Sequence, residues 1–326
     1  MKRVMAAVLA GVMAFSLTAC GGGAAKDAGS GETAEGKGEK TYKVALMADG
    51  AGFGSQSFND VALEGLEKAK ADFGIELTTL EVKEVADFAN SLRSLAQQGC
   101  DLIITPSSTI KDAVTEVAAE YPDIQFCHAT GYQAKDSGLD NMHNYFASIY
   151  EARYLAGIAA GMKTESNKLG YVAAFPFAEV ISGYTAFYLG AKSVNPDVTM
   201  DIMYTNSWND PTVESQVAKA LIERGCDVIS QHSDSTAPAT TAEENGAFQV
   251  GYNNDMIEAA PKASLISARI DWGIYVTEAV QNLIDGKEIP VDWCKGLADG
   301  AVYLSPLNTD IAAEGTQEAI IRLQTH

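Results

Sequence analysis

The chain has 326 residues, of which 47% are hydrophobic and 20% charged, so it can bury a sizeable core and is long enough for two domains. Lys and Arg total 23 against 43 Asp and Glu, a formal net charge of −20. So acidic a surface argues against nucleic acid or an anionic membrane surface as the partner, and for a soluble monomer. The net charge does not exclude a small-molecule ligand, because a local binding site can be neutral.

The N-terminus has the pattern of an export signal over residues 1–19. Two basic residues precede an apolar run, 4–15, that is too short to span a bilayer as a permanent helix. The run ends in Leu17-Thr-Ala-Cys20, which resembles the lipobox of bacterial lipoproteins; a chance run of small residues is the alternative. The resemblance implies cleavage before Cys20 and lipidation of its thiol, which would anchor the protein at the extracytoplasmic face of the cell membrane. Residues 20–40 then read as the lipidated Cys and a flexible linker, because they contain too few apolar residues to pack.

Strands and helices alternate from residue 41 onward. The first half has expected strands at 43–47, 76–82, 101–105 and 124–128, with helices at 58–73, 88–96 and 110–121 between them. The second half repeats the pattern, with strands at 169–174, 199–204, 227–230 and 248–252 and helices at 181–194 and 213–224. Such alternation favours an α/β fold with parallel sheets covered on both faces.

The two halves contain one segment that is nearly repeated. Ala96–Ile104 and Ile222–Ser230 match closely, and the spacing from the opening strand agrees, since 101 − 44 = 57 and 227 − 170 = 57. The duplication predicts a two-lobed protein in which each lobe is a doubly wound parallel sheet.

The remaining segments predict that the chain returns to the first lobe. An apolar helix, 148–164, joins the halves, and a helix at 272–285, a segment at 290–305 and a last helix at 311–323 follow the second half. This leftover material implies three crossovers and a cleft between the lobes. We therefore assign 41–147 plus about 271–298 to the N-terminal lobe, and 148–270 plus about 299–326 to the C-terminal lobe.

Loops that follow the strands define the candidate site, because ligands of parallel α/β sheets collect outside the carboxyl ends of the strands. Trp208 is central, since a tryptophan between a strand and a helix is unusual in a loop. The candidates from the first lobe are Asp49, Phe53, Phe58, Asn59, Ser107 and Ser108. Those from the second lobe are Trp208, Asn209, His232, Asp234, Asn253 and Asp255, with Phe175 and Phe177 at the rim or in the core. No Lys or Arg lies in these loops, so the lining suits a flat, neutral, hydrogen-bonding ring better than a phosphate or carboxylate.

Structural roles for the same residues stay open. Trp208 could cover the core of its own lobe, and Phe58 could be only the first core contact of its helix. His232 could be a structural histidine, while Asp234 and Asp255 could cap helices.

Several motifs together carry a family resemblance. They are Ser57-Phe-Asn59, Tyr150–Gly157, Gly190–Pro196, Ser207–Pro211, His232–Pro238 and Asp299–Val302. In this combination the chain resembles the basic membrane protein (BMP) family of substrate-binding lipoproteins, which serve ABC importers and include purine-nucleoside receptors. The resemblance implies a type I periplasmic-binding-protein fold with three crossovers. It also implies a purine stacked between Trp208 and either Phe58 or Phe53, and delivery to ABC permease and ATPase subunits.

One departure from the family pattern bears on the ligand. Nucleoside-binding members carry an Asp and a Lys that hold the ribose hydroxyls, and those positions correspond here to Asn253 and to Ala268 or Arg269. Together with the Ser-Trp-x-Asp-Pro form of the loop at 207–211, this resembles the branch associated with free bases such as adenine. A nucleobase is therefore favoured over a nucleoside, which stays the alternative.

Other function classes find little support. Gly50–Gly54 opens like a dinucleotide-binding loop, but Ser55 stands where its third glycine should be, and no catalytic motif is present, so we expect neither a cofactor nor an enzyme. A DNA-binding regulator of similar fold would need a basic helix-turn-helix in place of the lipobox. A receptor that signals without transport stays open.

The cysteines and histidines do not form a metal-binding pattern. Cys100, Cys127, Cys226 and Cys294 lack Cys-x-x-Cys spacing, and the four His are scattered, so we expect no zinc site. Cys100 and Cys226 occupy matching points in different lobes, which places them beyond disulfide reach. We expect free, mostly buried thiols.

Overall fold

A computed structural model describes residues 40–54 and 58–324. The predicted signal peptide, the lipidation site at Cys20 and nearly all of the linker lie outside the described residues. Within those ranges, the helices are too short or too polar to cross a membrane. The chain divides into units 1–40 and 41–326, and the fold below is that of the second unit.

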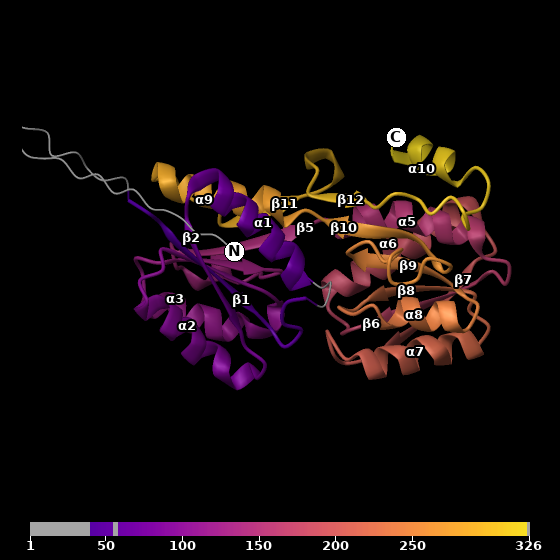
Figure 1. The fold of residues 1–326 in the computed structure, drawn as a ribbon, viewed down its shortest axis with the longest axis horizontal. Coiled ribbons are helices and arrows are strands. Elements are labelled where there is room, and N and C mark those ends of the chain that lie inside the picture. Colours follow the sequence, from indigo (N-terminus) through magenta and orange to yellow (C-terminus); the bar gives the residue numbers. More distant parts are fainter. Residues whose placement is uncertain (1–39, 55–57, 325–326) are drawn as a thin grey trace, which may run out of the picture. The chain divides into compact units, whose positions relative to one another are not determined.

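The first sheet contains six parallel strands in the order β11-β5-β4-β3-β1-β2. The strands are β1 (Lys43–Ala48), β2 (Glu76–Glu81), β3 (Leu102–Thr105), β4 (Gln125–Ala129), β5 (Met142–Ala147) and β11 (Asp292–Lys295). Its helices are α1 (Phe58–Phe73), α2 (Phe88–Gln97), α3 (Lys111–Glu120), α4 (Ala134–Ser137) and α9 (Trp272–Asp285), with 3₁₀ turns η1 (Val85–Asp87) and η2 (Ser108–Ile110). Figure 1 shows α1 and α9 on one face of this sheet and α2 and α3 on the other.

Helices on both faces explain why β1 is apolar throughout. Val44 and Leu46 belong to the core that includes the apolar residues of α1 and α9, whereas Ala45 and Met47 belong to the core beneath α2 and α3. Successive side chains of a strand point to opposite faces, so both sets are buried.

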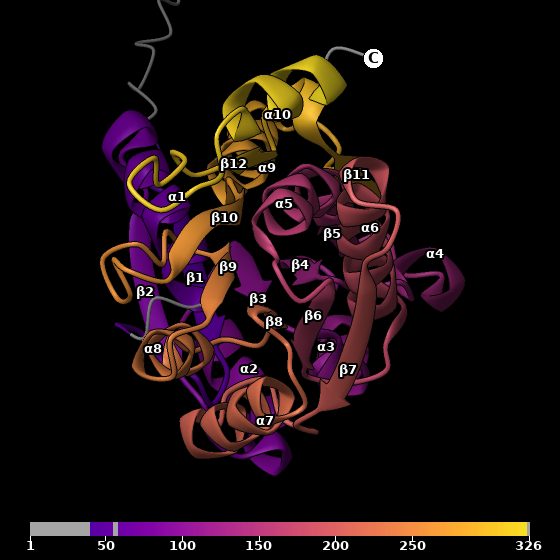
Figure 2. The ribbon, with the colours of Figure 1, turned by 90° about the vertical axis from the view of Figure 1, so that its right-hand side faces the viewer.

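The second sheet repeats the arrangement with one exception. Its order is β12-β10-β9-β8-β6-β7, and β12 pairs with β10 in the antiparallel direction, so the predicted parallel sheet has one antiparallel edge strand. The strands are β6 (Lys168–Ala173), β7 (Thr199–Tyr204), β8 (Val228–His232), β9 (Phe248–Asn253), β10 (Ser264–Ile270) and β12 (Val302–Leu304). Its helices are α5 (Ile149–Lys163), α6 (Ala178–Val194), α7 (Pro211–Glu223), α8 (Ala237–Glu244) and α10 (Thr316–Gln324), with the 3₁₀ turn η3 (Leu297–Asp299). Figure 2 shows α7 and α8 together on the side of this sheet away from α5 and α6.

The chain passes between the sheets three times, after β5, after β10 and after β11. The predicted two-lobed α/β fold with three crossovers is therefore confirmed. The lobe boundaries themselves stay a prediction, which the membership of β11 in the first sheet and of β12 in the second supports.

The structure also corrects individual elements. The last helix starts at Thr316 instead of 311, because Gly315 has a positive φ of 79°, a conformation outside the helical region. Strands β11 and β12 fall in the segment 290–305, for which no element type was predicted, and helices α4 and α8 and strands β5 and β10 were not predicted. Both strands contain buried polar residues, such as Asn144 in β5 and Ser267 in β10, which interrupt the apolar pattern that strand prediction relies on.

The four cysteines of the described ranges are free thiols. Cys100, Cys127 and Cys226 are buried and Cys294 is exposed. Complete burial raises the pKa of the Cys127 thiol to about 12, so this thiol is unreactive at neutral pH.

Candidate functional site

A cavity that is partly open to solvent lies at the carboxyl ends of strands from both sheets. It is lined by Asp49, Phe58, Ser107, Thr130, Phe146, Ala147, Ile149, Glu179, Trp208, His232, Asp234, Tyr252, Ile270 and Trp272. Three of the lining residues end strands β5, β8 and β10, Tyr252 is the next-to-last residue of β9, and four more lie in the loops that follow β1, β3, β4 and β7. This is the expected position of a ligand site in an open parallel sheet.

Trp208 lies in the loop between β7 and α7. The loop turns at Asn206, whose φ of 55° is left-handed, and ends at Asp210, whose carboxylate accepts hydrogen bonds from the backbone N–H groups of Thr212 and Val213 at 3.1 Å. The indole lines the cavity and lies edge-on to Phe175 at 5.5 Å between ring centroids. Its Nε1–H has no hydrogen-bond partner among the described residues. Trp208 therefore has both of the roles considered from the sequence, since its ring lines the cavity and also packs against the hydrophobic core.

Asp234 is held in place by two residues that were predicted as ligand contacts. Its backbone oxygen accepts a hydrogen bond from Asn209 Nδ2 at 2.6 Å, and its Oδ1 accepts one from Asn253 Nδ2 at 2.7 Å. Its own N–H donates to the carbonyl oxygen of Trp208 at 2.7 Å. Asn253 has a left-handed φ of 64°, which asparagine tolerates better than most residues. Asn209 and Asn253 thus support Asp234 and do not line the cavity themselves.

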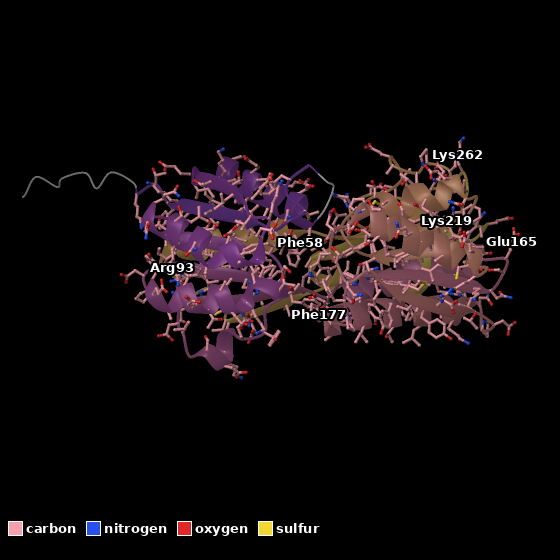
Figure 3. All side chains as sticks on the ribbon, turned by 90° about the horizontal axis from the view of Figure 1, so that it is seen from below. Phe58, Arg93, Glu165, Phe177, Lys219 and Lys262 are labelled. Carbon is pink, nitrogen blue, oxygen red and sulfur yellow. The ribbon has the colours of Figure 1, made fainter. Side chains whose placement is uncertain are left out.

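In the first half, Asn59 supports Asp49 in the same way. Asn59 is buried and its Nδ2 donates to Asp49 Oδ1 at 2.9 Å and to the carbonyl oxygen of Gly52 at 3.1 Å. Asp49 and Phe58 both line the cavity, and Phe58 is the first residue of α1. Figure 3 labels Phe58 together with Phe177, and both lie where the two sheets approach each other.

Three further candidates take other positions. The half-buried Phe53 packs against the core and does not line the cavity, and Asp255 accepts a hydrogen bond from the N–H of Ile257 in a local turn. Ser107, which has a left-handed φ of 55°, does line the cavity. The backbone of Ser108 begins η2, and its side chain lies outside the described part of the chain.

Several lining residues were not predicted, among them Thr130, Glu179, Tyr252 and Trp272. Glu179 lies in the first turn of α6, where burial raises its pKa to about 7 and a hydrogen bond with Thr130 opposes the shift. Because Thr130 follows β4, this bond joins the two halves of the chain at the cavity. The end of a strand is the signal that could have identified Tyr252, whereas Trp272 follows a strand, β10, that the sequence did not reveal.

A buried cation lies behind His232 and Tyr252. Arg153 Nη1 donates to the carbonyl oxygen of Gln231 at 2.9 Å, and its guanidinium lies 4.3 Å above the ring centroid of Tyr252, a cation–π contact. Burial lowers the pKa of His232 well below its usual value, and the charge of Arg153 lowers it further. His232 therefore presents a neutral imidazole to the cavity.

The lining combines aromatic rings with carboxyl groups. Asp49, Glu179 and Asp234 contribute acceptors, and no Lys or Arg belongs to the described lining. Burial raises the pKa of Asp234 well above its usual value, with the neighbouring Asp49 and Glu214 adding to the shift. Such a site favours a flat ligand that presents N–H donors and disfavours an anion. Within the described residues, no cluster of His, Cys, Asp and Glu is arranged to hold a metal ion.

The sequence of this chain matches one protein family and is similar to several known proteins. A family described as ABC transporter substrate-binding protein PnrA-like (Bmp) matches residues 42–325. A purine-binding protein of Brucella abortus (strain 2308) is 38% identical over 273 residues, which cover 82% of this chain and 76% of that protein. A putative ABC transporter glucose-binding protein of Haloferax volcanii is 37% identical over 241 residues, 74% of this chain and 60% of that protein.

Solved structures show the same fold. A solute-binding protein of an ABC transporter system from Aeropyrum pernix K1 superposes with a TM-score of 0.72 at 20% identity, covering 87% of this chain and 86% of that one. The family and the Brucella abortus relative are both described as binding proteins.

Proposed function

This chain belongs to the Bmp family of PnrA-like ABC transporter substrate-binding proteins, and from that premise we propose that it captures a purine, as the free base, in the cavity between its two halves. The observation that carries the proposal is the lining, in which aromatic rings from both halves surround three carboxyl groups without a cation. Stacking a base on an aromatic ring contributes roughly 1–3 kcal/mol, and the carboxyl groups accept the N–H groups at the base edge.

A hexose is the main rival, because the Haloferax volcanii relative is described as a putative glucose-binding protein. The Brucella abortus relative supports the purine, being similar over a larger share of both chains. The mixture of aromatic rings at the cavity, Phe58, Trp208, Tyr252 and Trp272, also favours a ligand with two flat faces.

Two contacts support a base over a nucleoside. Asn253 replaces a ribose-binding carboxylate of the family pattern, and its amide already donates to Asp234. Arg269 turns away to the carbonyl oxygen of Asn253 at 3.4 Å and to Asn254 Oδ1 at 3.3 Å, and it packs over the ring of Tyr303. No carboxylate and lysine pair is therefore left to hold ribose hydroxyls at these positions.

The proposed mechanism is closure of the two halves on the base, followed by docking of the closed form on the permease of an ABC importer. Substrate-binding proteins of such importers work outside the cytoplasm, and lipidation of Cys20 would tether this one to the cell membrane. Hydrogen bonds such as that between Glu179 and Thr130 would strengthen the closed form.

Calorimetry on ligand-free protein tests the proposal. We expect adenine, guanine or hypoxanthine to bind more tightly than their nucleosides and much more tightly than glucose. Trp208→Ala should weaken binding of the preferred base at least tenfold, about 1.4 kcal/mol, without unfolding the protein. Trp293→Phe, at a tryptophan whose indole donates to Glu278 away from the cavity, is the control. Tighter binding of a nucleoside would reverse the choice of the base, and tighter binding of glucose would reject the purine.

A further inference from the structure

Trp272 combines deep burial with a position at the cavity. It is the first residue of α9, directly after β10, and Asp271 caps the helix by accepting a hydrogen bond from the N–H of Gly273 at 2.8 Å. Its ring is 1% exposed and lies edge-on to Phe58 at 5.2 Å and to Tyr145 at 5.0 Å. The helix start and these aromatic contacts leave the indole little freedom to turn.

The indole N–H of Trp272 is unpaired in an environment where that is costly. Its Nε1 is buried and has no hydrogen-bond partner among the described residues. Native proteins rarely leave a buried donor unpaired, because it loses its hydrogen bonds to water and gains none in exchange. Trp293, in the same predicted lobe, has the usual arrangement of a paired indole, because its Nε1 donates a hydrogen bond to Glu278 Oε2 at 3.1 Å.

We propose that Trp272 is a specificity-determining residue whose indole N–H donates a hydrogen bond to a ring nitrogen, N1, N3 or N7, of the bound purine base. The inference rests on the proposed function and adds a requirement to it. The rings of Phe58 and Tyr145 contact the indole edge-on, and the cavity that Trp272 lines is where a ligand would bring a strong hydrogen-bond acceptor.

The requirement narrows the ligand chemistry. The carboxyl groups of Asp49, Glu179 and Asp234 take N–H groups from the ligand, and Trp272 takes a lone pair. The ligand must then present N–H donors and at least one ring-nitrogen acceptor in the same plane, as a purine base does. A planar ring of equal size without that acceptor would leave the indole N–H unpaired and bind more weakly.

Trp208 needs separate treatment, because its Nε1 is also unpartnered at the same cavity. Both donors can be assigned by replacing one ligand atom at a time. The experiment combines Trp272→Phe and Trp208→Phe with the purine base that the wild-type protein binds most tightly and with its 1-deaza, 3-deaza and 7-deaza analogues, in which a ring nitrogen becomes C–H. Affinities are measured by calorimetry.

We expect Trp272→Phe to weaken binding of the parent base about five- to tenfold. One deaza analogue should bind the wild-type protein more weakly by a similar factor, and Trp272→Phe should weaken that analogue no further. Trp293→Phe should leave every affinity unchanged. Additive effects of Trp272→Phe and all three nitrogen replacements would overturn the proposal, as would unchanged affinity of the variant for the parent base.

A measurement on the wild-type protein covers the case in which Trp272→Phe folds poorly. The three tryptophans give three indole ¹H–¹⁵N signals, and Trp208→Phe and Trp293→Phe assign the remaining one to Trp272. Addition of the base should shift this signal strongly, and the deaza analogue that lacks the acceptor should not reproduce the shift. Equal shifts with the base and all analogues would contradict the hydrogen bond. If no purine binds the wild-type protein, the proposed function fails and this inference fails with it, whereas purine binding with additive effects rejects only the role of Trp272.

Discussion

Glu214 is expected to hold together the two loops that carry Trp208 and Asp234, and replacing it should separate binding from stability. Its side chain is 0% exposed. Its Oε1 accepts a hydrogen bond from the N–H of Asp210 at 3.0 Å, while its Oε2 accepts from Ser233 Oγ at 2.8 Å and Ser235 Oγ at 2.6 Å. Asp210 belongs to the Trp208 loop, and the two serines flank Asp234, so one carboxylate positions both loops.

Glu214→Gln keeps the shape of the side chain and removes its charge. The amide oxygen can still accept from Asp210, but the amide nitrogen replaces the oxygen that received two serine hydroxyls. Charge-assisted hydrogen bonds contribute about 1 kcal/mol more than neutral ones, so ordering of the Asp234 loop should lose about 1–2 kcal/mol. We expect purine affinity to fall about five- to thirtyfold by calorimetry.

The stability of the wild-type protein relative to Glu214→Gln should fall as the pH rises. Burial raises the pKa of Glu214 above its ordinary 4.5, although the two serines oppose the shift. The folded state therefore keeps a proton that the unfolded chain has released, and raising the pH above about 4.5 through the folded pKa costs the wild-type protein stability. We expect the free energy of unfolding in urea to increase for Glu214→Gln relative to wild type as the pH rises through this range, since glutamine does not titrate.

Ser215→Ala is the matched control. Ser215 is the next residue of α7, and its hydroxyl accepts a hydrogen bond from Thr241 Oγ1 at 3.0 Å, which joins α7 to α8 without contacting either loop. We expect this variant to bind purine like wild type. Unchanged affinity in Glu214→Gln, or an equal loss in Ser215→Ala, would refute the positioning role.

The remaining predictions concern the fold and the anchor. Gly190→Ala should destabilise the protein by at least about 1–3 kcal/mol in chemical unfolding, because the added Cβ would collide with the carbonyl oxygen of Tyr154 where α6 crosses α5. Leu189→Ala, at the neighbouring exposed position, is the control and should destabilise the protein far less. Equal losses of stability in the two variants would argue against the close crossing. Cys20→Ala should release the protein from the membrane fraction of its cells without changing purine affinity, and a variant that stays in that fraction would contradict the lipid anchor.

The sequence determined the architecture by itself because its signals are local and repeated. Apolar strands alternate with amphipathic helices, and the copy of Ala96–Ile104 at Ile222–Ser230 marks the second half. Loop position also identified six candidates that line the cavity, namely Asp49, Phe58, Ser107, Trp208, His232 and Asp234. This worked because the carboxyl ends of parallel strands meet at one edge of each sheet.

Only the tertiary structure decided which polar residues face the cavity and which support them. Asn209 and Asn253 lie near strand ends just as Asp234 does, and each of them is hydrogen-bonded to Asp234, 25 and 19 residues away in the sequence. Trp272 reads as the first core residue of a helix, and its place at the cavity depends on β10, a strand hidden in the sequence by buried serines. The same local sequence can place a polar side chain where it binds a ligand or where it binds another loop. Only the distances between segments far apart in the chain distinguish the two roles.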